Sequence, residues 1–181
     1  QGRIDVFFLG GVQIDGEANV NLVGTVGEAG YPEIQRRFPG SFGSAHMYFV
    51  VPKVILFRPE HTRRVFVPKV DFISAPGVSE PDVRRPGGPK FLVTERCLMS
   101  FHADRRRFKL ESVHPGHTLE DVLENTGFEF DIPETVPMTP APEPERLDLL
   151  RSRIGAQIGA TYPGFAARVF GIEANSGGKA S

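Results

Sequence analysis

The sequence predicts an α/β fold with an open, mixed, mostly parallel sheet, flanking helices and a C-terminal hairpin. Three observations indicate this class. Short apolar runs bounded by glycine are typical of buried parallel strands, loops and helical segments separate these runs, and two late β runs adjoin across a short polar turn. The chain has 181 residues, 40% of them hydrophobic, which is enough for one globular core.

The first half of the chain supplies short strands between glycine-rich loops. Apolar and β-branched residues favour the strands, and glycine and proline favour the loops. The segment before Pro52 must end there, because the residue before proline avoids the helical region. The predicted elements are strands over residues 4–9 and 19–26, a loop over 27–40, a short helix or strand over 44–51, and strands over 54–57, 65–67 and 70–73.

The second half supplies the hairpin and the helices. Thr118 and Asp121 form a capping-box pattern that begins a helix, and Gly127 is predicted as its left-handed C-cap. The predicted elements are an irregular loop over residues 75–89, hairpin strands over 91–102 and 107–113, a helix over 119–126, a strand over 128–132, a proline-rich connector over 133–144 and an amphipathic helix over 145–154.

We expect one α/β domain over residues 1–154, followed by a tail over residues 155–181 that is partly disordered. The chain enters an apolar run almost at once, which looks like the middle of a domain, so we expect that its N-terminal part is lacking. No signal-peptide pattern is present, and no apolar run is long enough to span a bilayer.

Charge and cysteine content narrow the classes of function. The formal net charge of −1 implies no strong field for nucleic acid or for a membrane surface. The single cysteine, Cys97, excludes an internal disulfide framework, fits the reducing cytoplasm, and is expected in the core. The 15 phenylalanines fall mainly in strand-like runs and are expected in the core or at an interface.

The end of the first apolar run, Gly10-Gly11-Val12-Gln13, is a candidate ligand site. Ligands of open α/β sheets bind beyond the carboxyl ends of the strands. Two glycines let backbone N–H groups approach a ligand, and Gln13 adds a neutral donor and acceptor. The alternative is a tight junction between a strand and a turn.

A second loop, FPGSFGSAH, has small residues that lead into a short helix. Its N–H groups could hold a phosphate or a cofactor arm, yet it lacks the lysine of a phosphate loop, and the chain has no dinucleotide fingerprint. His46 is either an acid or base of this site or a polar residue on a helix face. His114 and His117 have no third ligand nearby in the sequence, so no metal site is expected.

With these segments on the page, the chain resembles the β subunit of class I CoA-transferases, in the glutaconate CoA-transferase-like group. The resemblance rests on DVFFLGGVQIDGEANVN, RRFPGSFGSA, RRVFVPKVDFISAPG and SVHPGHTLEDVLENTGFEFDIPE, which follow the family's order between Asp5 and Glu134. Val12 and Phe42 depart from the usual patterns GGAQID and LPGSGG. The variant GSFGSA, with RPGGP, is most similar to the branch of steroid-ring-opening CoA hydrolases.

The resemblance implies an enzyme that pairs with an α subunit in a heterodimer or a higher assembly. It implies an acyl-CoA substrate, with coenzyme A as part of that substrate and no permanently bound cofactor, metal, nucleic acid or membrane. The implied activity is hydrolytic ring opening of a steroid-derived cyclic CoA thioester in the cytoplasm. The alternatives are CoA transfer between carboxylic acids and a non-catalytic scaffold for the α subunit.

The resemblance also carries roles to single residues. Gln13 is expected to polarise a carbonyl together with backbone N–H groups, while a carboxylate of the α subunit activates water. The family's nucleophilic glutamate lies upstream of the GGxQ segment and is assigned to no residue here. The residues expected to contact substrate or CoA are Gly10, Gly11, Gly40, Ser41, Phe42, Gly43, Ser44 and His46, and Phe42 either narrows the acyl pocket or fills a void.

Two further features stay open at this point. Arg36-Arg37 and Arg84-Arg85 are basic pairs in loops, where they could meet CoA phosphates or a partner subunit. Asp71 interrupts an apolar strand and, if buried, needs a partner such as Lys69 or Arg64.

Overall fold

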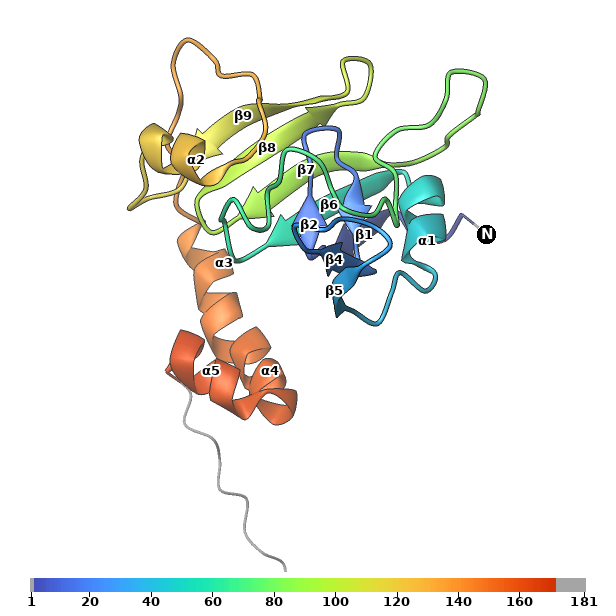
Figure 1. Cartoon of the computed structure of the whole chain (residues 1–181). Helices are drawn as coiled ribbons and strands as arrows, with labels where there is room; N and C mark the ends of the chain where they lie inside the picture. The colour runs from blue at the N-terminus through green and yellow to red at the C-terminus, as the bar shows by residue number, and fades with distance from the viewer. Residues whose placement is uncertain (1, 172–181) are drawn as a thin grey trace, which may run out of the picture. The chain divides into compact units, whose positions relative to one another are not determined.

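The computed structural model describes residues 2–171, and its contacts divide the chain into two units, Gln1–Thr139 and Pro140–Ser181 (Figure 1). The division follows Thr139, whereas the sequence placed a boundary after residue 154. Helices occupy residues 155–161 and 163–170 of the expected tail. The disorder expected for the final NSGGKAS lies outside the described residues.

The first unit is built on one five-stranded sheet in the order β1-β6-β7-β8-β9 (Figure 1). β1, β6 and β7 run parallel, and β8 and β9 continue the sheet antiparallel, which confirms the predicted mixed α/β sheet. The carboxyl ends of the three parallel strands therefore share one edge. The strands are β1 (Val6–Leu9), β6 (Lys53–Arg58), β7 (Pro89–Thr94), β8 (Cys97–His102) and β9 (Arg107–Val113).

The prediction of a single strand over residues 91–102 was wrong, because the chain turns between β7 and β8. The hydroxyl of Thr94 accepts hydrogen bonds from the backbone N–H groups of Arg96, at 3.0 Å, and Cys97, at 3.1 Å. A threonine side chain closes this turn, so neither glycine nor proline marks it in the sequence. The expected hairpin is thus the second half of a three-stranded meander.

Two short strand pairs follow β1 in the chain. They are β2 (Gln13–Ile14) with β3 (Val20–Asn21), and β4 (Gly24–Val26) with β5 (Ile34–Arg37). The predicted strand over residues 19–26 is divided because the Asn21 side chain bonds the backbone of Val23 and Gly24. The predicted strands over residues 65–67 and 70–73 form only isolated bridges, Ile14 with Phe66 and Val20 with Ala75.

Two helices belong to the first unit, α1 (Ser44–Val50) and α2 (Leu119–Asn125). The capping box of Thr118 and Asp121 is confirmed. Gly127 is not a left-handed C-cap: α2 ends at Thr126 in an extended conformation. Gly127 instead packs so closely on the carbonyl oxygen of Phe66 that a Cβ would collide with it.

The second unit is helical throughout its described part. The predicted helix over residues 145–154 continues through a π-helical turn into the next helix. The elements are α3 (Pro144–Leu149), the π-helix η1 (Leu150–Ile154), α4 (Gly155–Thr161) and α5 (Pro163–Phe170).

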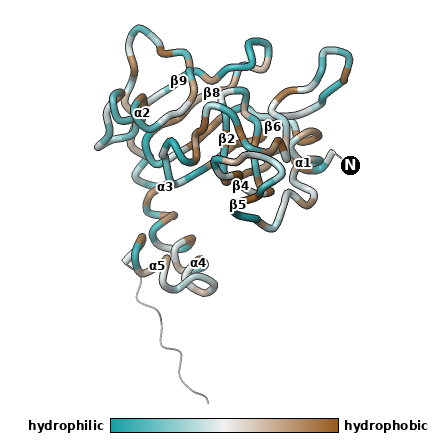
Figure 2. Tube along the Cα trace, viewed as in Figure 1, coloured by the Kyte–Doolittle hydropathy of each residue, from teal (hydrophilic) through white to brown (hydrophobic). Residues whose placement is uncertain are grey.

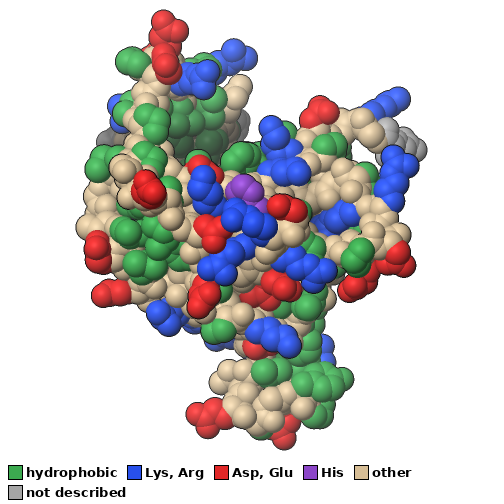
Figure 3. Space-filling model, turned by 90° about the horizontal axis from the view of Figure 1, so that it is seen from above, with side chains coloured by type: hydrophobic (Ala, Val, Ile, Leu, Met, Phe, Trp, Pro, Cys, Tyr) green, Lys and Arg blue, Asp and Glu red, His purple; other side chains and the backbone are tan. Residues whose placement is uncertain are grey.

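The core of the first unit lies between one face of the sheet and the segments that follow β1 and β6. Tyr48, Phe66, Phe108, Leu56 and Met99 are fully buried there. Hydrophilic residues mark the turn between β8 and β9 (Figure 2). On the face seen from above, basic and acidic side chains alternate (Figure 3), so surface charges of both signs lie close together.

The long loop before β7 is held by Arg85. Its guanidinium donates to the carbonyl oxygens of Tyr48, Pro76 and Gly87, at 2.8 to 2.9 Å, and lies 5.1 Å from the centre of the Tyr48 ring. Arg85 is therefore committed to fixing the loop against α1, and is not free for the phosphates or the partner that the sequence suggested.

Candidate functional site

A hollow of about 850 Å³ opens at the carboxyl edge of the parallel strands. It lies beyond Arg58, the last residue of β6, and beside Gln13, which follows β1 after the two glycines. The strand pair β4–β5 supplies another wall. We call this space the Gln13 hollow. Its polar lining comes from Gln13, Thr25, Gln35, Arg36, Arg58, Arg64 and Asp71.

The side chain of Gln13 is buried and held by three hydrogen bonds. Its Oε1 accepts from Asn21 Nδ2 at 2.7 Å and from the backbone N–H of Asp71 at 3.0 Å. Its Nε2 donates to Asp71 Oδ2 at 3.1 Å. These partners fix which end of the amide is oxygen, and they leave one N–H of Nε2 without a partner among the described residues.

Asp71 completes this arrangement from residues far away in the chain. Its Oδ2 also accepts from the backbone N–H of Val26 at 3.0 Å. The expected partners, Lys69 or Arg64, were wrong: the carboxylate is satisfied by amide groups. The network ties β2 to β4 and orients Gln13 at the wall of the hollow.

Asp15 fixes the turn between β2 and β3. The carboxylate is 3% exposed and accepts four hydrogen bonds, from Glu17 N, Asn19 N, Asn19 Nδ2 and Val70 N, at 3.0 to 3.3 Å. The sequence GGVQID therefore has a division of labour, in which Gln13 faces the hollow and Asp15 holds the backbone behind it.

Three arginines give the hollow its charge. Glu60 contacts Arg64 at 2.7 Å and Arg58 at 3.4 Å. The hydrogen bond from Arg64 holds the pKa of Glu60 below its usual value. Arg36, on β5, has no carboxylate within ion-pair distance among the described residues.

Of the predicted site residues, Gln13 lines the hollow, and Gly10 and Gly11 do not. Gly11 is buried, and a Cβ there would lie 2.7 Å from Val20 Cγ1. Its small size is thus required by packing against β3 whether or not a ligand is bound.

The second predicted segment, Gly40, Ser41, Phe42, Gly43 and Ser44, lies at the start of α1 and does not line the Gln13 hollow. Gly40 donates its N–H to the carbonyl of Leu22 at 3.1 Å, next to β3, against which Gly11 packs. Both glycine segments are therefore anchored to neighbouring residues. Phe42 is 87% exposed and His46 is exposed on α1, so neither is enclosed within this chain.

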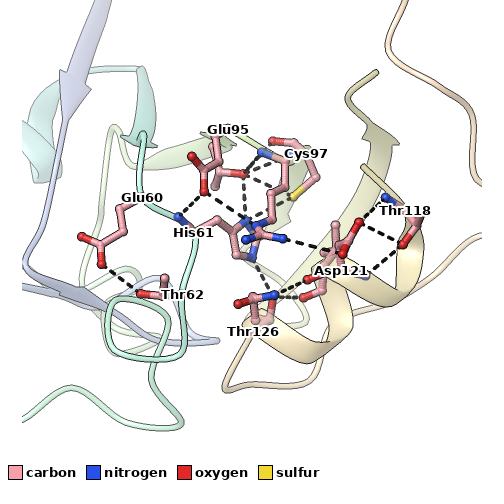
Figure 4. A network of polar contacts seen from close by, with 12 residues as sticks. Glu60, His61, Thr62, Glu95, Cys97, Thr118, Asp121 and Thr126 are labelled. Carbon is pink, nitrogen blue, oxygen red and sulfur yellow. Dashed lines mark hydrogen bonds and ion pairs between the residues drawn. The ribbon is translucent and has the colours of Figure 1, made fainter. Parts of the chain in front are cut away.

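A separate polar cluster around His61 is buried between the β7–β8 turn and α2 (Figure 4). Thr126 donates its hydroxyl to the carbonyl of Val122, so it must accept from His61 Nε2, at 2.9 Å. His61 Nδ1 then accepts from the Thr94 hydroxyl at 2.8 Å. Burial lowers the pKa of His61 to about 4, so the ring is neutral and structural.

Cys97 borders the same cluster and is fully buried, which confirms its place in the core. Burial raises the pKa of its thiol to about 11, so the nucleophilic thiolate is disfavoured.

The sequence missed Arg58, Arg64 and Asp71 as residues of the hollow. Arg58 had a usable signal, since it is the last residue of a predicted parallel strand. Arg64 and Asp71 are brought to the hollow by segments without regular structure.

Within residues 2–171, no group of three or more histidine, cysteine or carboxylate side chains is placed to hold a metal ion. In the same range, no helix has the length and apolar character needed to cross a membrane.

Comparison with known proteins defines the class. Residues 1–125 match the profile of the family described as Coenzyme A transferase, and the chain belongs to this family. A curated 3-oxoadipate CoA-transferase chain of Pseudomonas knackmussii, the B member of its subunit pair, is 36% identical over 157 residues, which is 83% of this chain and 59% of that protein.

Solved structures agree with this assignment. Glutaconate CoA-transferase of Acidaminococcus fermentans superimposes with a TM-score of 0.69 at 32% identity, over 81% of this chain and 57% of the other. IpdAB of Rhodococcus jostii superimposes with a TM-score of 0.70 at 27% identity, over 81% and 59%. The chain thus spans less than two thirds of the length of these relatives.

Proposed function

We propose that this chain is the β-type subunit of a two-subunit enzyme that acts on acyl-CoA thioesters, with the acyl group in the Gln13 hollow. The observation that carries the proposal is the fixed Gln13 amide, which has one N–H left beside a hollow of about 850 Å³. A preoriented N–H stabilises an oxygen that gains negative charge during a reaction. Membership of the Coenzyme A transferase family supports a CoA thioester as substrate.

The favoured activity is hydrolytic ring opening of a steroid-derived cyclic CoA thioester. Similarity to the cholesterol ring-cleaving hydrolase IpdB subunit of Rhodococcus jostii, 32% identical over 97 residues, supports it. A carboxylate of the α subunit takes a proton from water, whose oxygen bonds to a ring ketone carbon. The adjacent C–C bond breaks, and its electron pair moves to the carbon beside the thioester, which regains the proton. The Gln13 N–H stabilises the thioester oxygen while it carries the charge as an enolate.

CoA transfer between carboxylic acids is the second candidate, supported by the names of the 3-oxoadipate and glutaconate enzymes. There the Gln13 N–H would stabilise the oxyanion formed when a carboxylate attacks the thioester carbon. Transfer through an enzyme-bound thioester is trapped by hydroxylamine or borohydride in the presence of acyl-CoA, whereas direct hydrolysis is not.

An exposed apolar surface supports the proposed association with an α subunit. Val6 and Phe8 alternate on one face of β1, continued by Ile4, and Phe8 meets Phe57 of β6 edge to face at 6.3 Å. All four side chains are at least 40% exposed, and a cluster of this kind marks a contact surface. The lone, reduced Cys97 is consistent with a cytoplasmic location.

Replacing Gln13 with methionine tests the proposed function. Methionine has similar volume but no N–H, so we expect turnover of acyl-CoA by the complex with its co-purified α subunit to fall about 100-fold. The measurement is steady-state kinetics on complexes whose assembly and thermal unfolding have been checked.

Gln157→Met is the matched control, because Gln157 is exposed on α4 in the second unit. It should leave turnover unchanged. If an assembled Gln13→Met complex turned over like the wild type, the chain would be a scaffold for an active α subunit.

A further inference from the structure

We propose that the Gln13 hollow also binds a carboxylate at the far end of the acyl group, through Arg58 and Arg36. The substrate is then a CoA thioester whose acyl chain carries a second, anionic end. This inference rests on the proposed function, because it takes the thioester oxygen to lie at Gln13.

The position of Arg58 is the first observation. It ends β6 at the carboxyl edge of the parallel strands, and its side chain lines the hollow while 35% exposed. Its Nε is buried without a hydrogen-bond partner among the described residues. Its contact with Glu60 is long, at 3.4 Å, because the carboxylate lies closer to Arg64. The guanidinium therefore has donors to spare for a planar oxyanion.

The charge balance of the wall is the second observation. Arg36, Arg58 and Arg64 face the same space, with only Glu60 and Asp71 to offset them. Both oxygens of Glu60 contact arginines, and Asp71 accepts from Gln13 and Val26. One positive charge remains, and Arg36 on β5 has no acidic partner among the described residues.

The anion belongs to the acyl group and not to coenzyme A. In coenzyme A, the pantetheine arm separates the phosphates from the sulfur, so an anion that shares one hollow with the thioester oxygen must lie on the acyl side. Hydrolytic opening of a ring ketone also creates a carboxylate on the acyl chain. The same arginines would therefore hold the product of ring opening or a dicarboxylic acid in transfer.

The test compares two CoA thioesters of equal chain length, glutaryl-CoA and pentanoyl-CoA, which differ by the terminal carboxylate. Their dissociation constants are measured on the assembled two-subunit complex, with free CoA as a third ligand. We expect the wild type to bind glutaryl-CoA at least 10-fold more tightly than pentanoyl-CoA. Arg58→Gln should weaken glutaryl-CoA about 10- to 100-fold and leave pentanoyl-CoA and CoA within about twofold.

Arg36→Gln provides a second variant, since Arg36 is exposed and its replacement does not disturb the core. It should weaken glutaryl-CoA in the same way. Arg84→Gln, exposed in the loop before β7, is the matched control and should change no ligand.

Equal binding of the two thioesters by the wild type, or equal loss of free CoA in the arginine variants, would overturn the inference. If Gln13→Met still abolished turnover in that case, the proposed function would stand and only the carboxylate site would be refuted.

Discussion

Replacing Asp15 with alanine is expected to lower the free energy of unfolding by about 4 kcal/mol. The carboxylate is 3% exposed and accepts four hydrogen bonds, from Glu17, Asn19 and Val70. Hydrogen bonds to a charged acceptor are stronger than neutral ones, and alanine would leave most of these donors buried without a partner. Urea unfolding of the isolated chain at neutral pH measures the change.

Asparagine at the same position separates hydrogen bonding from volume. Asp15→Asn keeps the size, but its NH2 group would face either the donors at Oδ1 or those at Oδ2, so it should also destabilise. Asp82→Ala, at an exposed position of the loop before β7, is the control and should stay within about 0.5 kcal/mol of the wild type. A loss below about 1 kcal/mol for Asp15→Ala would show that the turn does not depend on this carboxylate.

The second large effect is a loss of stability in mild acid caused by His61. The folded ring has a pKa of about 4 because it is buried, against 6.5 for an exposed histidine. Between these values the unfolded chain binds a proton that the folded chain does not, so the free energy of unfolding decreases as pH falls. The contribution is complete above pH 6.5 and declines by about 3 kcal/mol as pH approaches 4.

Urea unfolding between about pH 7 and pH 4.5 measures this slope. His61→Asn is less stable at neutral pH, since bonds to Thr94 and Thr126 are lost, but it should lack most of the pH dependence. His46→Asn, exposed on α1, is the matched control and should keep the wild-type slope. An unchanged slope in His61→Asn would assign the acid sensitivity to other groups.

Local patterns in the sequence were sufficient for much of the fold. The apolar run before Gly10 is β1, the run after Pro52 is β6, and Thr118 with Asp121 begins α2 as predicted. These features depend on neighbouring residues, whose propensities and capping groups are visible in the sequence. The failures came where a side chain replaces the usual turn residue, as Thr94 does between β7 and β8.

The candidate site was only partly predictable for a different reason. Gln13 could be placed because it follows a strand at the carboxyl edge of a parallel sheet. Its partner Asp71 lies 58 residues away, on a segment without regular structure that no periodic pattern aligns with β2. Contacts of this kind are fixed by tertiary packing, and the arginine wall of the hollow depends on them.

The most direct test of the account is the structure of the two-subunit complex with a bound acyl-CoA. We expect the acyl group in the Gln13 hollow, with the thioester oxygen about 3 Å from Gln13 Nε2. An acyl-CoA bound elsewhere, with the hollow filled by side chains of the α subunit, would contradict the account.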